Sequence, residues 1–126
     1  MPSGDSVEYD AMLQAIEEAR RCVSESGRNS PLVGAALLRG DKLLGVAYRG
    51  ELDEGDHAEF TLLERKLTDV NLEGTTLVTT LEPCVTRNHP KRPCADRIAE
   101  RGISRVLIGM LDPNPDITGK GVLRLR

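Results

Sequence analysis

The chain has few cysteines, almost no aromatic residues and no long apolar run. Its 126 residues include three cysteines, two tyrosines, one phenylalanine and no tryptophan. Three thiols cannot all pair, and a domain of this length buries an adequate core without disulfide bonds. No apolar segment approaches the roughly 20 residues that a membrane-spanning helix needs. Because the first residues lack the basic and apolar regions of a secretion signal, we expect one cytoplasmic domain over residues 1–126, with residues 1–6 loose.

The charge balance is mildly acidic, with a formal net charge of −3 at pH 7. A general nucleic-acid binder usually carries a basic face, which this balance argues against. Aromatic side chains make up only 2% of the chain, so the stacking platforms that grip single strands are scarce as well. We therefore expect neither a nucleic-acid partner nor a membrane partner.

The hydrophobic pattern predicts alternating helices and strands. Helical periodicity covers residues 8–26 and contains Cys22, which we expect to be a half-buried core thiol. Two apolar runs, 32–38 and 43–48, flank a short turn with a glycine and predict a β-hairpin. The later pattern predicts a helix over 57–68, a strand over 75–81, a loop over 83–93, a helix over 94–101, a strand over 105–110 and an irregular segment at 112–115. This alternation favours a layered α/β sheet.

Metal-ligating residues lie at the ends of these predicted elements. His57 opens one predicted helix, Cys94 opens the next, and Cys84 follows the predicted strand over 75–81. One imidazole and two thiols are ligands of a catalytic zinc site, which keeps a fourth position open for water. Helix starts carry partial positive charge, which stabilises thiolates. We therefore predict that His57, Cys84 and Cys94 bind Zn²⁺.

Glu59 adds a carboxylate two residues after His57. On a regular helix the two side chains would point about 200° apart, but at a helix start, where His57 is only half helical, both can reach one cavity. Zinc lowers the pKa of a bound water, and a neighbouring carboxylate can take a proton and return it to a departing amine. This combination is typical of zinc-dependent base deaminases, so we predict that Glu59 is the catalytic proton shuttle.

Simpler interpretations of these residues remain open. A closed structural zinc site needs four ligands, and His89 is the only other histidine in the chain. Free cysteines are often simply buried in a core. Glu59 could be an ordinary glutamate on the surface of a helix. A four-ligand zinc site would be purely structural, whereas buried cysteines and a surface glutamate would form no metal site.

The motifs together resemble the cytidine deaminase superfamily. The narrower likeness is to the deaminase half of bifunctional riboflavin-biosynthesis proteins, and it extends over about residues 29–125. It is carried by Pro-x-Val-Gly at 31–34, Leu-Glu-Pro-Cys at 81–84, Arg-Pro-Cys at 92–94, Asp-Pro-Asn-Pro at 112–115 and Gly-Lys-Gly at 119–121. The resemblance implies a three-layer α/β/α fold with a mixed central sheet. It also implies hydrolytic deamination of an aminopyrimidine that carries a ribose phosphate.

The resemblance further implies where substrate would bind. In the family, the loop that corresponds to the basic segment 85–93 helps to hold the phosphoribosyl group, which makes His89 and Lys91 candidate phosphate contacts. A merely solvated basic loop is the alternative. Asn29 and Ser30 lie where the family usually has an asparagine, and they are the other candidate contacts.

Two other functions remain open at this point. Within the same chemistry, the substrate could be cytidine, deoxycytidylate or a guanine-type nucleoside or nucleotide. In a different class, the chain could be an inactive deaminase-fold module that binds a nucleotide or a partner, although the intact Glu59 argues against it. Because the superfamily adds a helix and a strand after the amphipathic stretch 121–126, we also expect a homo-oligomer or a place within a longer chain.

Overall fold

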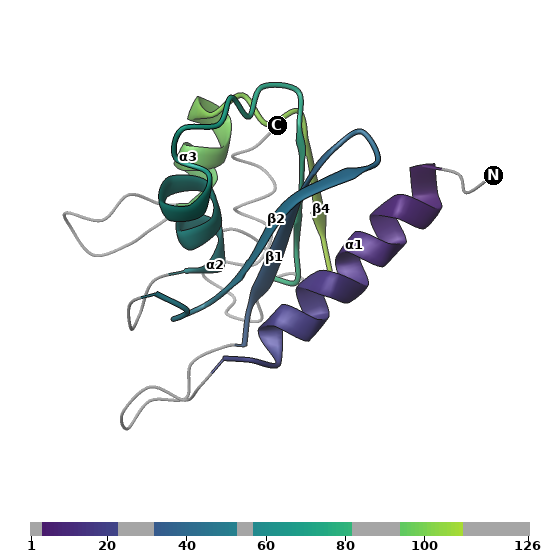
Figure 1. Cartoon of the computed structure of the whole chain (residues 1–126), viewed down its shortest axis with the longest axis vertical. Coiled ribbons are helices and arrows are strands. Elements are labelled where there is room, and N and C mark those ends of the chain that lie inside the picture. Colours follow the sequence, from purple (N-terminus) through teal and green to yellow (C-terminus); the bar gives the residue numbers. More distant parts are fainter. Residues whose placement is uncertain (1–3, 23–31, 53–56, 82–93, 110–126) are drawn as a thin grey trace, which may run out of the picture.

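A computed structural model describes residues 4–22, 32–52, 57–81 and 94–109, with residues 4–6, 94 and 95 as backbone only. These residues form a four-stranded sheet with helices on both faces (Figure 1). Its strands, in chain order, are β1 (Gly34–Arg39), β2 (Lys42–Tyr48), β3 (Thr76–Thr79) and β4 (Arg105–Ile108). Its helices are α1 (Gly4–Ala19), α2 (Ala58–Phe60), the π-helix η1 (Thr61–Lys66) and α3 (Cys94–Glu100). Among these described helices, none is both long and apolar enough to span a membrane.

The sheet is mixed, as the resemblance implied. Its strand order is β2-β1-β3-β4. β1 pairs antiparallel with both β2 and β3, whereas β3 and β4 are parallel. The predicted hairpin is confirmed, because β1 and β2 are joined by a tight turn in which Gly40 has a φ of 61°. That left-handed conformation is one that glycine adopts without strain.

Alternation along β1 divides the core between the two faces of the sheet. Ala35 and Leu37 pack in a cluster with α2, η1 and α3, while Ala36 and Leu38 pack with α1. Figure 1 shows α1 on one side of the sheet and α2 with α3 on the other. Successive side chains of a strand point to opposite faces, so one short apolar run serves both layers. The three-layer α/β/α arrangement is therefore confirmed.

The first helix differs from its prediction at both ends. The periodicity predicted a helix over residues 8–26, but α1 begins at Gly4, inside the segment that was expected to be loose, and ends at Ala19. Val7 packs against the α1-side cluster, which explains the extension toward the N-terminus. Helical periodicity alone does not show this tertiary contact.

The C-terminal end of α1 lies directly beside the start of β1. A Cβ atom added to Gly34 would lie 1.8 Å from the carbonyl oxygen of Ala15, so the two backbones are in direct contact. Cys22 follows the helix, and its thiol donates a hydrogen bond of 3.4 Å to the carbonyl of Val33. The chain therefore reverses direction soon after Ala19. Cys22 is half-buried, as predicted, but it lies beyond the helix.

The second helix was predicted as one regular helix over residues 57–68. Instead, the short α2 passes into the π-helix η1, where the Leu67 amide donates a hydrogen bond of 3.0 Å to the Leu62 carbonyl. Such five-residue hydrogen bonding is rare and frequently marks functional sites. The predicted segments at 83–93 and 112–115 lie outside the described residues. The other predicted elements are confirmed with small shifts: 75–81 became Thr76–Thr79, 94–101 became Cys94–Glu100 and 105–110 became Arg105–Ile108.

Candidate active site

The carboxyl ends of β2, β3 and β4 meet at one edge of the sheet. Tyr48, at the end of β2, pairs with Gly34. The Gly34 amide donates a hydrogen bond to the Thr80 hydroxyl, and the Thr80 amide donates one to the Gly34 carbonyl, each at 3.1 Å. On the other side of β3, the amide of Gly109 donates a hydrogen bond of 2.9 Å to the Thr79 carbonyl. Ligand sites of open α/β sheets lie at such an edge. The described residues that follow β2, β3 and β4 leave the sheet at this edge.

His57 is the N-cap residue of α2. Its backbone is extended, with φ −65° and ψ 151°, and its carbonyl accepts a hydrogen bond of 3.0 Å from the Thr61 amide. The residue therefore precedes the helix while already closing its first turn. Its side chain is half-buried. The prediction that His57 opens the second helix is confirmed.

Glu59 is buried, with 3% of its surface exposed, and lies in the first turn of α2. Its neighbours Ala58 and Thr61 are fully buried. A carboxylate at this position is favoured by the positive end of the helix dipole. The interpretation of Glu59 as a surface glutamate is therefore wrong. The 200° separation of a regular helix does not apply here, in agreement with the prediction that His57 is only half helical, because His57 precedes the helix with an extended backbone.

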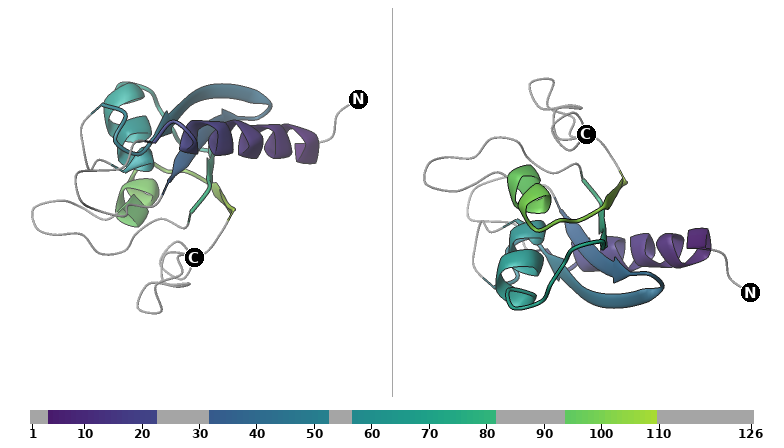
Figure 2. Two further views of the ribbon diagram at one scale, coloured as in Figure 1. Left: turned by 90° about the horizontal axis from the view of Figure 1, so that it is seen from below. Right: turned by 90° about the horizontal axis from the view of Figure 1, so that it is seen from above.

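Cys94 is the first residue of α3, as predicted. Figure 2 shows α3 beside the helical segment formed by α2 and η1 in two views. The guanidinium carbon of Arg97 lies 4.7 Å from the centre of the Phe60 ring, and Nη1 of Arg101 lies 3.7 Å from Oε1 of Glu64. Arg97 contacts Phe60, and four residues further along the chain Arg101 contacts Glu64, so the contacts follow the same direction in both segments. α3 therefore runs parallel to α2 and η1.

These contacts also place the two helix starts at the same level. Phe60 lies three residues beyond His57, and it contacts Arg97. Arg97 in turn lies three residues beyond Cys94. Because the helices are parallel, the backbone of His57 and the backbone of Cys94 both lie at the N-terminal ends of the pair. The structure thus describes two neighbouring helix starts, one with His57 and Glu59 and the other at Cys94.

The remaining predicted site residues lie outside the described residues; these are Asn29, Ser30, Cys84, His89 and Lys91. Within the described side chains, no three groups of the His, Cys, Asp and Glu types lie close enough together to hold a metal ion. Of the predicted ligands, only the His57 side chain belongs to that described set.

A hollow of about 560 Å³ lies on the α1 side of the sheet, opposite the two helix starts. It is lined by apolar residues of α1, such as Met12 and Ile16, and by the residues that follow β3, Thr80 and Leu81. Its described lining residues carry no titratable side chain. Within the part of the chain that the structure describes, the two helix starts are therefore the candidate active site.

Sequence reasoning missed the residues that hold these helix starts together. Phe60, Glu64, Arg97 and Arg101 join α3 to α2 and η1. A signal was present, since Arg97 and Arg101 are four residues apart on a short helix and so share one face. Their partners could not be identified without the packing of the two helices.

The chain belongs to the family of cytidine and deoxycytidylate deaminases, whose zinc-binding region matches residues 6–110. It is 35% identical over 117 residues to the riboflavin biosynthesis protein RibD of Synechocystis sp., covering 91% of this chain and 30% of that protein. It is 39% identical over 99 residues to the diaminohydroxyphosphoribosylamino-pyrimidine deaminase of Buchnera aphidicola, covering 77% of this chain and 63% of that protein.

A solved structure supports the same family assignment. RibD of Acinetobacter baumannii matches 98% of this chain and 33% of its own, with a TM-score of 0.81 and 32% sequence identity. The resemblance inferred from the motifs is therefore confirmed, as is the deaminase-like fold. The chain spans about a third of the length of these RibD relatives.

Proposed function

We propose that this chain is a zinc-dependent hydrolytic deaminase of an aminopyrimidine on a phosphorylated small molecule, of the kind used in riboflavin biosynthesis. One observation carries the proposal: the buried carboxylate of Glu59 lies at a helix start, two residues after His57, in a helix that packs beside α3, which begins at Cys94. The names of relatives at 35% and 39% identity support the choice of substrate.

His57, Cys84 and Cys94 would hold the zinc ion. An imidazole and two thiols are donors that zinc prefers, and three protein ligands leave a fourth position open. The first-turn position of Cys94 favours its thiolate form, because helix N-termini stabilise negative charge. The zinc-binding region of the family covers all three residues. When bound, zinc acts as a Lewis acid that lets water attack at neutral pH.

Glu59 would move the protons of the reaction. Water adds its oxygen to the ring carbon, the exocyclic carbon–nitrogen bond breaks, and the amino group leaves as ammonia. The Glu59 carboxylate would accept a proton from the attacking water and donate it to the departing nitrogen. Proton transfer by a positioned group contributes about 10²- to 10⁴-fold to a rate. Burial keeps bulk water from competing for this proton.

The contacts to the rest of the substrate remain proposals from the sequence. His89 and Lys91 would contact the phosphate, which suits their donors and charge. Asn29 and Ser30 would contact the remainder of the ligand. We also retain the expectation of a cytoplasmic protein that works as a homo-oligomer or within a longer chain.

Ammonia release tests the proposal. The parent protein and Glu59→Gln would be incubated with the diaminopyrimidine ribose phosphate of riboflavin biosynthesis, cytidine, deoxycytidylate and guanine, with zinc content measured in parallel. We expect the parent to release ammonia from the first substrate and Glu59→Gln to lose at least about 100-fold in rate while retaining zinc. Activity only on another substrate would correct the substrate. A zinc-loaded parent that is inactive on all four would favour the binding module.

A further inference from the structure

Arg101 binds η1 and the turn that follows it through three hydrogen bonds. Its Nη1 atom donates to the Leu63 carbonyl at 2.5 Å, and its Nη2 atom donates to the carbonyls of Leu67 and Val70 at 2.9 Å each. Its side chain is only 19% exposed. A single residue directly after α3 therefore holds the C-terminal part of the neighbouring helical segment and the turn after it.

The end of η1 needs such a donor. η1 ends at Lys66, and the last carbonyls of a helix have no partner within it. A guanidinium carries five N–H donors in one rigid plane, so it can satisfy several carbonyls at once. An ammonium group is a compact point charge and cannot reproduce this planar arrangement.

Glu64 and Arg97 complete the contact between the two helical segments. Oε1 of Glu64 lies 3.7 Å from Nη1 of Arg97 and 3.7 Å from Nη1 of Arg101. All three side chains are largely buried. Arg97 also lies over the ring of Phe60, near the N-terminal ends of both helices. Because these contacts are spread over the length of α3, they prevent it from sliding or rotating along α2 and η1.

A metal site requires its ligands to be placed accurately, so the position of α3 along α2 and η1 is important. A slip of one residue moves a helix by 1.5 Å along its axis and by about 100° around it. Zinc–ligand distances hold within about 0.2 Å. A one-residue slip of α3 would therefore remove Cys94 from any ligand set that includes His57.

We propose that Arg101 is a positioning residue for the metal site: with Glu64 and Arg97, it fixes α3 on α2 and η1 and thereby fixes Cys94 relative to His57. This inference rests on the proposed function, because it assumes that both residues bind the metal. It assigns Arg101 no contact with the substrate.

Zinc affinity of Arg101→Met and Arg101→Lys tests the inference. The dissociation constant would be measured by competition with a chromophoric chelator, at a temperature where each variant is folded. Loss of a residue that orients metal ligands typically weakens metal binding by about 10- to 100-fold, which is the loss expected for Arg101→Met. Arg101→Lys should bind with intermediate affinity. The Co²⁺-loaded variant should also show altered thiolate and ligand-field absorption bands, which a loss of stability alone would not change.

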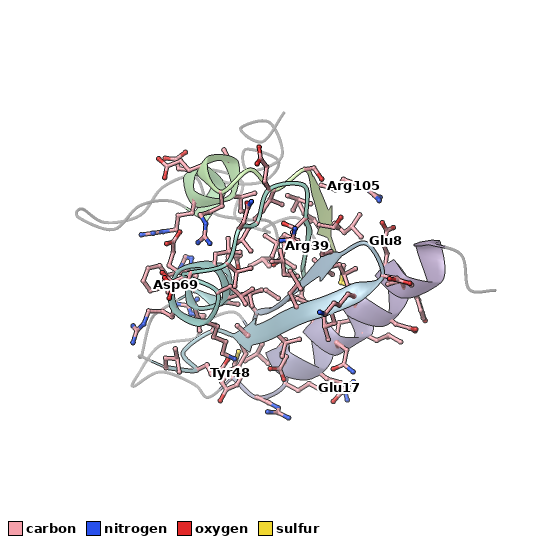
Figure 3. The ribbon with its side chains drawn as sticks, turned by 45° about the horizontal axis from the view of Figure 1, so that its top comes forward. Glu8, Glu17, Arg39, Tyr48, Asp69 and Arg105 are labelled. Atoms are coloured by element: carbon pink, nitrogen blue, oxygen red, sulfur yellow. The ribbon has the colours of Figure 1, made fainter. Side chains whose placement is uncertain are left out.

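Arg105→Met is the matched control. Arg105 is also an arginine that joins two elements, since it contacts Glu8 of α1 from β4, on the other side of the sheet (Figure 3). We expect its zinc affinity and its cobalt spectrum to equal those of the parent protein.

The possible outcomes separate the two proposals. If the parent binds zinc and Arg101→Met binds it equally well with an unchanged cobalt spectrum, the inference is overturned while the proposed function stands. If the parent binds no zinc, both are overturned. If Arg101→Met does not fold, Arg101→Lys carries the test, because an ammonium group cannot reproduce the planar donors to the three carbonyls. Zinc affinity equal to that of the parent, with an unchanged cobalt spectrum, would then overturn the inference.

Discussion

The two faces of the central sheet are built differently. On the α1 face, small residues such as Ala11, Ala15 and Ala36 allow a helix backbone to contact the strand at Gly34. The opposite face is packed by larger side chains, which include Leu62 and Leu63 of η1 and Ile98 of α3. The same strands thus support one face with a direct backbone contact and another face packed by larger side chains, on which the two helix starts lie.

The helices on the two faces also differ in length. α1 has 16 residues, whereas α2, η1 and α3 have three, six and seven. Helices shorter than about 12 residues are marginal on their own, so the second face depends on tertiary contacts. The candidate catalytic residues lie at the starts of these short helices. Their positions are therefore set by side chains such as Arg101 rather than by local helix stability.

The largest expected effect is on the chemistry of the α2–α3 face. Glu59→Gln keeps the size of the side chain and removes its ability to accept a proton. We expect ammonia release to fall by about 10²- to 10⁴-fold with zinc content unchanged. The control is Glu17→Gln on α1, whose side chain is 64% exposed and far from the site, and which should retain full activity. Similar rates for Glu59→Gln and the parent would contradict the role of Glu59.

The next effect tests the packing of the same face. Leu62 is fully buried, and Leu62→Ala should lower the free energy of unfolding by about 2–5 kcal/mol, because it removes apolar contacts and leaves a cavity. Leu13→Ala is the control, since Leu13 is 45% exposed on α1 and should cost about 0.5 kcal/mol or less. Urea unfolding measures both. Equal losses would show that the core does not lie where the structure places it.

A third change tests the close contact on the α1 face. Gly34→Ala would place a methyl group against the Ala15 backbone, so we expect a loss of about 3 kcal/mol in the free energy of unfolding. The matched change on the opposite face is Gly45→Ala. Its added Cβ would lie 3.2 Å from the flexible end of Leu62, and we expect a loss of about 1 kcal/mol or less. If Gly45→Ala were the more damaging change in urea, the contrast between the faces would be wrong.

The smallest effect belongs to the outer surface of α1. Arg20 forms an ion pair of 3.3 Å with Glu17, and the two side chains are 72% and 64% exposed. Exposed pairs of this kind contribute little, so Arg20→Ala should change the free energy of unfolding by less than about 0.5 kcal/mol. A thermal unfolding scan of both proteins would detect a larger loss, which would show that this surface contributes more than its exposure implies.

Much of the fold could be predicted from the sequence because its signals are local. The hairpin has two apolar runs on either side of a turn that contains a glycine, and His57 follows directly after a polar segment of the sequence. The ends of α1 could not be predicted, because its start depends on the packing of Val7 and its end lies where the helix backbone contacts Gly34. No periodicity within residues 8–26 contains that information.

In the candidate site, too, the features with local signals were predicted and those that depend on tertiary contacts were not. The residue types and spacing of His57 and Glu59 indicated a deaminase, and burial of Glu59 agrees with that prediction. The π-helix and the contacts of Arg101 with three carbonyls were not predicted. The Arg101 contacts depend on how the end of α3 packs against a segment that lies more than 30 residues away in the chain, and no local pattern in the sequence indicated the π-helix.

The zinc content of purified parent protein and of His57→Ala, after dialysis against a weak chelator, tests the central claim most directly. The account predicts about one zinc ion per chain in the parent and a content near zero in His57→Ala, because three protein ligands define a catalytic site. Circular dichroism would confirm that the variant is folded. Equal zinc content in the two proteins, or a parent without zinc, would contradict the assignment of the two helix starts as the metal-binding active site.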